Sequence, residues 1–237
     1  MPVVLFDANT AFHTRWSAQF VSADRLNRRS VPMNGALSRA QLRDVIKNAA
    51  ALAGRTAGNE LIFAVGHGGA LQGTAAGTVD LAPAQKMRLS RSTAANIFVD
   101  PFYDFVFSHP GVTKPMSDKD QDQKWVSQNA PQKAAAQDRL ARWAMYESIG
   151  SAIKTNNIYR VVLLTCNVGN AVDFVKKIAL DWKVLVRAYT RFVLFSLDPK
   201  TGKSRVFLQG DQPGMGTNTS AGETQLPQVD FITVGPP

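Results

Sequence analysis

The chain has 237 residues, of which 45% are hydrophobic, so it is long enough for one large or two small α/β domains with a proper core. Its formal charge of +9 is spread along the chain and indicates a solvated basic surface. The single cysteine excludes an intramolecular disulfide framework and a multi-cysteine zinc site, and it favours a reducing, cytoplasmic compartment. Because no apolar run approaches 18 residues, no transmembrane span is expected.

The first third of the chain predicts two buried strands separated by a helix. Residues 3–6 are typical of a first strand rather than of a signal peptide, because a basic region and a cleavage site are missing. Residues 10–32 are polar and irregular, which indicates a loop with a short helix. Ser38 is a plausible N-cap for a helix over 39–52. A second apolar strand over 61–65 then leads into Gly66-His67-Gly68-Gly69.

A long insertion is expected at about residues 70–132. It begins with a stretch rich in Gly, Ala and Thr, contains an aromatic segment at 97–107, and ends in a polar segment. Structureless loops of this length are unusual unless they are functional or disordered. The insertion could therefore serve as a lid, a processing loop or a surface for a partner.

The second half of the chain predicts further alternation of helices and strands. A helix over 132–153 precedes a strand over 159–164 that ends at Cys166. The remaining expected elements are a helix over 168–180, a strand over 183–188, a β-hairpin of 192–197 with 205–208, and an edge strand over 229–234. This order predicts a three-layer α/β/α sandwich with a mostly parallel sheet and a C-terminal β-hairpin, in a single domain over 1–237.

His67 and Cys166 each follow a continuous apolar run. Such runs are typical of buried parallel strands, and reactive groups in open α/β sheets lie just beyond the carboxyl ends of the strands. We therefore expect the only cysteine and one of three histidines to lie at the same edge of one sheet. A Cys–His nucleophile pair needs this arrangement.

The two blocks, residues 62–69 and 161–169, resemble the histidine and cysteine blocks of the caspase-like (clan CD) cysteine peptidases. In style they are closest to the bacterial CHAT-type and toxin self-processing proteases. Two features depart from the caspase pattern. The two residues are 99 positions apart, against roughly 50 in caspases, and Leu164-Thr165 stand where caspases have Gln-Ala.

The resemblance implies a bacterial cysteine endopeptidase that cleaves a protein substrate through an acyl-enzyme. Cys166 would be the nucleophile, its thiolate favoured by a helix that begins near Val168. His67 would protonate the leaving amine, and the backbone N–H groups of Gly68 and Cys166 would form the oxyanion hole. No metal or cofactor is needed for this chemistry. A regulatory protein partner is expected, with a role in defence, cell death or the processing of a toxin or effector.

Substrate specificity is open at this stage. Arg187 and Arg191, around the strand expected at 183–188, could prefer an acidic residue, whereas Asp173 or Asp181 could prefer a basic one. Solvated surface charge is the alternative for all four. Asp7, after the first strand, could face the same edge as His67 or cap a helix.

Two other functions stay open. In the first, the chain is a catalytically inactive α/β module that binds a protein, and Cys166 is a buried structural thiol. In the second, which ranks last because no base-reading motif is visible, the +9 charge serves nucleic-acid binding. His13 and His109 lack the strand-end context of His67.

Overall fold

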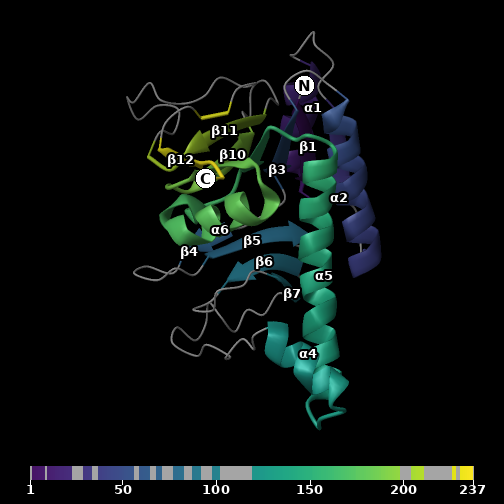
Figure 1. The fold of residues 1–237 in the computed structure, drawn as a ribbon. Helices are drawn as coiled ribbons and strands as arrows, with labels where there is room; N and C mark the ends of the chain where they lie inside the picture. The colour runs from purple at the N-terminus through teal and green to yellow at the C-terminus, as the bar shows by residue number, and fades with distance from the viewer. Residues whose placement is uncertain are drawn as a thin grey trace.

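A six-stranded sheet forms the centre of the protein in the computed structural model (Figure 1). The structure describes residues 2–8, 10–22, 29–33, 37–55, 59–64, 68–70, 77–82, 87–91, 98–101, 119–197, 204–210, 226–227 and 230–236. The strand order is β12-β9-β8-β3-β1-β2, with β12 antiparallel to β9 and all other pairs parallel. The strands are β1 (Pro2–Asp7), β2 (Arg29–Met33), β3 (Glu60–Ala64), β8 (Arg160–Leu163), β9 (Leu185–Tyr189) and β12 (Phe231–Val234). The expected α/β fold with a mostly parallel sheet is confirmed at this level.

One face of the sheet is covered by three helices. These are α2 (Arg39–Gly54), α5 (Lys133–Thr155) and α6 (Val172–Trp182), and they pack on alternate residues of the strands. Ser38 is the N-cap of α2, as the sequence predicts. Its hydroxyl accepts a hydrogen bond from the N–H of Gln41, and the Gln41 side chain accepts one from the N–H of Ser38.

The opposite face carries helix α1 (Ala11–Ser22) and the antiparallel pair β10 (Val193–Leu197) and β11 (Ser204–Leu208). The intervening strand residues, such as Ile62 and Val162, pack against this layer. The expected hairpin turn at 198–203 lies outside the described residues. The main sheet is thus enclosed by a helical layer on one side and a mixed layer on the other.

The stretch 10–32 is more regular than the sequence indicates. It holds the 12-residue helix α1 and the strand β2, which pairs with β1 at the edge of the sheet. Pro32 and the exposed Ser30 weaken the strand signal, because proline is confined to sheet edges and polar residues break the apolar run. The prediction of a loop at 29–33 was therefore wrong.

The insertion contains a second sheet as well as a helix. The antiparallel strands β4 (Gly68–Ala70), β5 (Gly77–Ala82), β6 (Met87–Arg91) and β7 (Phe98–Pro101) follow in sequence order, and helix α4 (Lys119–Ser127) comes next. Most of the expected aromatic segment lies outside the described residues. Figure 1 shows the second sheet beyond the lower edge of the main sheet, with β7 next to α5.

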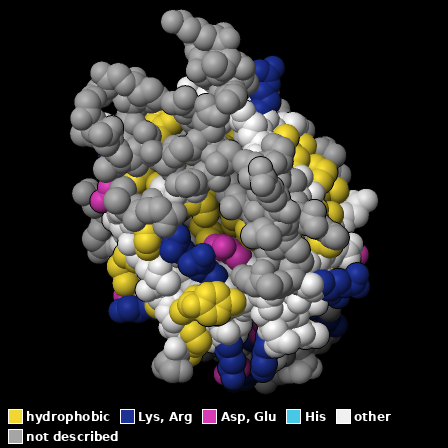
Figure 2. All heavy atoms as spheres, turned by 90° about the horizontal axis from the view of Figure 1, so that it is seen from above, with side chains coloured by type: hydrophobic (Ala, Val, Ile, Leu, Met, Phe, Trp, Pro, Cys, Tyr) yellow, Lys and Arg dark blue, Asp and Glu magenta, His cyan; other side chains and the backbone are white. Residues whose placement is uncertain are grey.

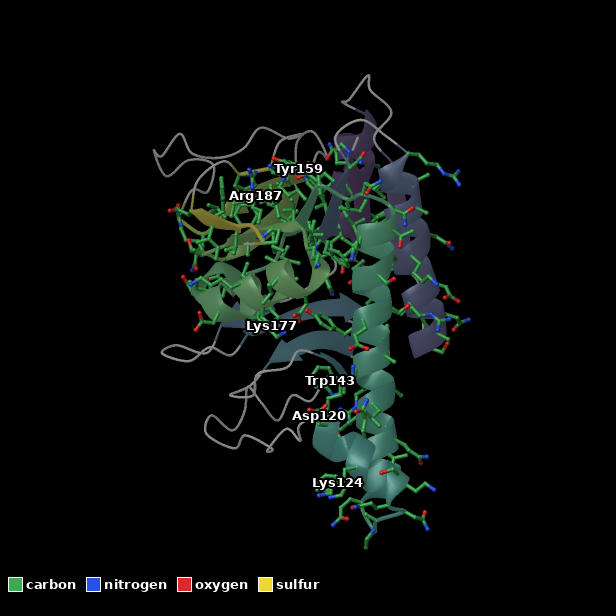
Figure 3. All side chains as sticks on the ribbon, in the orientation of Figure 1. Asp120, Lys124, Trp143, Tyr159, Lys177 and Arg187 are labelled. Carbon is green, nitrogen blue, oxygen red and sulfur yellow. The ribbon has the colours of Figure 1, made fainter. Side chains whose placement is uncertain are left out.

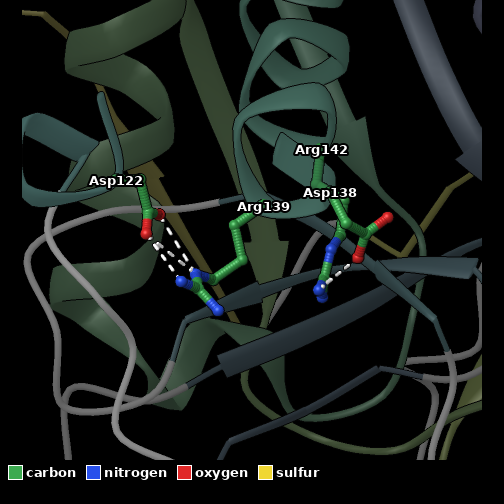
Figure 4. Close-up of polar contacts among 4 residues, drawn as sticks. All are labelled: Asp122, Asp138, Arg139 and Arg142. Carbon is green, nitrogen blue, oxygen red and sulfur yellow. Dashed lines mark hydrogen bonds and ion pairs between the residues drawn. The ribbon is translucent and has the colours of Figure 1, made fainter. Parts of the chain in front are cut away.

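Helix α4 is fixed to the N-terminal half of α5 by a buried ion pair (Figure 4). Asp122 is fully buried, and the Nε and Nη2 of Arg139 lie 3.1 and 2.7 Å from its Oδ1. The Trp125 ring lies 5.7 Å from the same guanidinium. In contrast, Asp138 and Arg142 form a within-helix pair on α5. Since an unpaired buried carboxylate is strongly destabilising, the Asp122–Arg139 pair specifies how α4 docks.

Candidate active site

Cys166 follows β8 at the carboxyl edge of the main sheet, next to the end of β3. The N–H of Leu164 donates to the Phe63 carbonyl at 2.9 Å, so the two strand ends are held together. Residues 65–67, His67 among them, lie outside the described residues, whereas Ala64 and Gly68 are described. Ala64 ends β3, and Gly68 begins β4, which lies against the 3-10 turn η2 (Val168–Asn170) that follows Cys166.

The strand order of the sheet reverses between β1 and β3, one strand away from β8. The chain passes from β1 outward to β2, then crosses back to β3 and continues in the other direction to β8 and β9. Ligands of open α/β sheets bind in the crevice beyond the strand ends at such a point. Asp7, at the end of β1, faces the carboxyl edge, and its carboxylate accepts a hydrogen bond from the Thr10 hydroxyl at 2.9 Å.

The Cys166 side chain is half-buried beneath strand β10. Its Sγ donates to the Val193 carbonyl at 3.4 Å, and burial raises the pKa of the thiol. The thiol is therefore protonated at neutral pH in this arrangement, and a base must take its proton before attack. The expectation that a helix near Val168 favours the thiolate was wrong, since only the single turn η2 begins there and α6 begins at Val172.

The backbone N–H of Cys166 has no hydrogen-bond acceptor among the described residues. An uncommitted donor on the same residue as the thiol suits an oxyanion hole. The other expected donor is Gly68, which is paired with Val79 in the second sheet. The oxyanion role of both N–H groups stays a prediction.

The loop from Cys166 to Asn170 is held by the corner between β9 and β10. Asn167 has a left-handed backbone with a φ of 55°, and its N–H donates to the Arg191 carbonyl at 3.1 Å. The Asn170 amide donates to the Thr190 carbonyl at 2.8 Å. A Cβ at Gly169 would lie 2.7 Å from the Ala188 carbonyl oxygen, so the loop fits closely against β9.

The Arg191 side chain connects this corner to two neighbouring segments of the chain. Its Nη1 lies 2.7 Å from a carboxylate oxygen of Asp230, and its Nη2 donates to the Gln209 carbonyl. The adjoining Gly210 has a φ of 94°, and a Cβ there would lie 2.8 Å from Nη2. Both guanidinium ends are therefore engaged with the protein, and a role in substrate binding stays a prediction.

The structure places Arg187 away from Cys166. Arg187 lies in the middle of β9, opposite Val162 on β8. Val162 lies within β8, four residues before Cys166, which follows the end of the strand. The guanidinium lies 4.1 Å from the centroid of the Phe231 ring. Arg187 and the Cys166 edge are thus not brought together.

The two aspartates considered for specificity lie at opposite ends of α6. Asp173 is in the first turn, exposed, with Lys176 at 3.9 Å. Asp181 is near the last turn and accepts hydrogen bonds from the Tyr146 hydroxyl and from Lys177. Only Asp173 is on the end of the helix that adjoins the Cys166 loop.

Sequence reasoning did not find the groups that hold the thiol and its loop. The carbonyls of Val193 and Arg191 carry no side-chain signal, because backbone acceptors depend on the tertiary fold alone.

Thr165, next to Cys166, has a buried hydroxyl with no hydrogen-bond partner in the described structure. His13 packs in α1 against Phe195 at 4.3 Å between ring centroids, and His109 lies outside the described residues.

Comparisons with family models, curated proteins and solved structures returned no match to this chain. Among the described residues, no cluster of three or more His, Cys, Asp and Glu side chains is suited to hold a metal ion. No helix in the described part of the chain is long and apolar enough to span a membrane. The site is therefore interpreted from its own geometry.

Proposed function

We propose that the chain is a cysteine endopeptidase in which Cys166 and His67 act as nucleophile and general acid–base. The observation that carries the proposal is the adjacency of β3 and β8. The strand that precedes Cys166 pairs in register with the strand that leads to His67, and both end at the same edge. The contact of β4 with η2 adds support, because β4 begins one residue after His67.

The proposed reaction has two covalent steps. The Cys166 thiol loses its proton to His67, and sulfur attacks the carbonyl carbon of the scissile peptide. The N–H groups of Gly68 and Cys166 stabilise the oxyanion, and the C–N bond breaks as His67 protonates the leaving amine. Water, deprotonated by His67, then attacks the thioester and releases the thiol and the carboxylic acid product.

The hydrogen bond from Cys166 to Val193 describes the resting form of this proposed site. Because burial raises the pKa of the thiol, spontaneous ionisation is disfavoured, and activity depends on a nearby base. A partner or substrate that shifts β10 would release the thiol from the Val193 carbonyl.

A protein-interaction module without catalytic activity is the second candidate. The hydrogen bond from Cys166 to Val193 also favours this candidate. A structural cysteine is often half-buried, protonated and bonded to a backbone carbonyl in the same way. In that case Cys166 would not react in a manner dependent on His67.

Cleavage of a mixture of unfolded proteins, followed by sequencing of new N-termini, tests the proposal. Wild-type protein is expected to produce new termini with a consistent residue before the cut, and Cys166→Ala is expected to produce none. Equal cleavage by Cys166→Ala would point to a contaminating protease and contradict the proposal. Absence of cleavage by both proteins, with and without the partners present in a host lysate, would favour the interaction module.

A further inference from the structure

Arg187 has an unusual environment for an arginine in the middle of a sheet. The side chain is half-buried, its Nε is buried with no acceptor, and the guanidinium has no carboxylate partner in the described part of the chain. It lies instead over the Phe231 ring. Buried polar groups without partners are rare in folded proteins and need an explanation, such as a bound ion.

The polar neighbour of Arg187 on its own strand does not supply an anion. Tyr189 donates its hydroxyl to the Pro227 carbonyl at 3.0 Å. Burial raises the pKa of Tyr189 to about 12, although the positive charge of Arg187 and a hydrogen bond with its side chain act in the opposite direction. The phenol is therefore neutral, and the positive charge of Arg187 is not balanced by it.

A second arginine lies on the same face of the sheet. Arg160 and Glu60 are opposite each other on β8 and β3, and the Arg160 Nε lies 2.8 Å from the Glu60 carboxylate. Only the Nε of Arg160 is used in this bond, so its two terminal nitrogens remain available. Because Arg160 is opposite Leu185, two residues before Arg187, the two arginines are diagonal neighbours on this face.

Glu60 and Arg160 are the first residues of their strands, at the amino edge of the main sheet, and Arg187 lies two residues further in, in the middle of β9. Figure 3 shows Arg187 and Tyr159 at the top of the molecule, whereas the second sheet lies below. Figure 2, seen from above, shows basic side chains beside an acidic one near the middle of this surface. The side chains of Arg160 and Glu60 are 27% and 12% exposed, so a small ligand can reach them while large flat surfaces cannot.

Glu60, Arg160 and Arg187 together carry a net charge of +1, which one negative charge would neutralise. A planar guanidinium also matches a carboxylate in geometry. We propose that Arg187 and the free nitrogens of Arg160 bind the carboxylate group of a small monoanionic ligand at the amino edge. The site is independent of the proposed peptidase activity, since it uses different residues at the opposite edge.

Titration of the full-length protein with sodium benzoate, at constant ionic strength against sodium chloride, tests this site. The readout is the ¹⁵N-detected Nε–H resonance of Arg187, assigned by its absence in Arg187→Lys. Benzoate is expected to shift this resonance saturably and chloride is not. A shift that is absent, or equal with both salts, would overturn the proposal. Tighter binding of phosphate than of benzoate would overturn the assignment to a monoanion.

Three variants keep the test decisive. Arg187→Gln is expected to weaken benzoate binding by about tenfold or more, as followed by backbone amides of β9 and β12. Glu60→Gln raises the net charge to about +2 and is expected to strengthen binding. Arg55→Gln, which removes an exposed positive charge at the end of α2, is the matched control and should leave binding unchanged. If Arg187→Gln is unstable, the comparison of Glu60→Gln with Arg55→Gln decides, and equal affinity of these two variants would contradict the proposal.

Discussion

The two edges of the main sheet hold their polar groups in different ways. At the amino edge, side chains from adjacent strands meet directly, as in the pair of Glu60 and Arg160. At the carboxyl edge, backbone groups hold the Cys166 loop through the carbonyls of Thr190, Arg191 and Val193. The first kind of contact can be changed by one substitution, whereas the second depends on how three segments of chain fit together.

At the carboxyl edge, the contacts that position the Cys166 thiol are separate from the group that would activate it. Among the described residues, the thiol of Cys166 is bonded to a backbone carbonyl and not to an ionisable side chain. The raised pKa of Cys166 then reflects burial, and its reactivity depends on whatever base the edge supplies. The proposed catalytic site and the proposed anion site therefore differ in how the fold holds their side chains.

The largest expected effect is the loss of peptidase activity in Cys166→Ala. Removing the nucleophile is expected to lower kcat/KM by about 10³-fold or more, because only substrate binding and the oxyanion donors remain. The fold should persist, since the thiol contributes one hydrogen bond, worth about 1 kcal/mol. Activity assays and urea unfolding check both parts. Full activity in this variant would show that the chemistry lies elsewhere.

A pair of glycine substitutions distinguishes the effect on activity of disturbing the carboxyl edge from that of disturbing the amino edge. Gly169→Ala would push its Cβ against the Ala188 carbonyl, and Gly54→Ala would push its Cβ against the Asn156 carbonyl. Both are expected to cost about 1–3 kcal/mol in the free energy of unfolding. Only Gly169→Ala should also lower activity per folded molecule, by about 10²-fold, since it displaces the Cys166 loop. Equal activity losses would mean that the edges are not independent.

Arg191→Gln has a smaller expected effect. Its ion pair with Asp230 is partly exposed, at 33% and 42%, so its loss should cost about 0.2–1 kcal/mol. Because both ends of the guanidinium are engaged in the corner, we expect kcat/KM to fall equally for peptides with acidic and basic residues before the cut. A selective loss with acidic peptides would instead assign Arg191 to substrate binding.

The smallest expected effect is on stability at high pH. The pKa of Cys166 is raised in the folded protein, so its contribution is complete below the ordinary thiol pKa of 9.0 and is lost as pH rises through the folded-state value. Wild type should therefore lose stability relative to Cys166→Ser above about pH 9. Urea unfolding at pH 7 and pH 10 measures the free energy of unfolding of both proteins. If it changes equally with pH in wild type and in Cys166→Ser, the thiol makes no such contribution.

The sequence was sufficient for the elements whose signal is local. Apolar runs predicted β3 and β8, and Ser38 predicted the start of α2, because burial and capping depend on neighbouring residues. Strand β2 was missed because an edge strand needs only half-burial and tolerates Pro32. The second sheet was missed because β4 has three residues and lies in a stretch rich in glycine and alanine, where periodicity is weak.

The candidate site was predicted only in part. The strand-end context of Cys166 follows from the sequence, but its partner Val193 is 27 residues away and acts through a carbonyl. The prediction of a helix directly after Cys166 overlooked Ala171, which separates η2 from α6. For Arg187 and Arg191, residue type indicated a pocket, whereas the register of β9 and the contact with Asp230 determine where these side chains lie.

The most direct test of a reactive Cys166–His67 pair is the rate at which a peptidyl electrophile labels Cys166, measured by mass spectrometry. Wild type, His67→Ala and the matched control His109→Ala should be compared at neutral pH. We expect His67→Ala to slow labelling by about 10²-fold or more, while His109→Ala labels at the wild-type rate. Equal, slow labelling of all three proteins would contradict an assembled Cys166–His67 pair and leave Cys166 as a structural thiol.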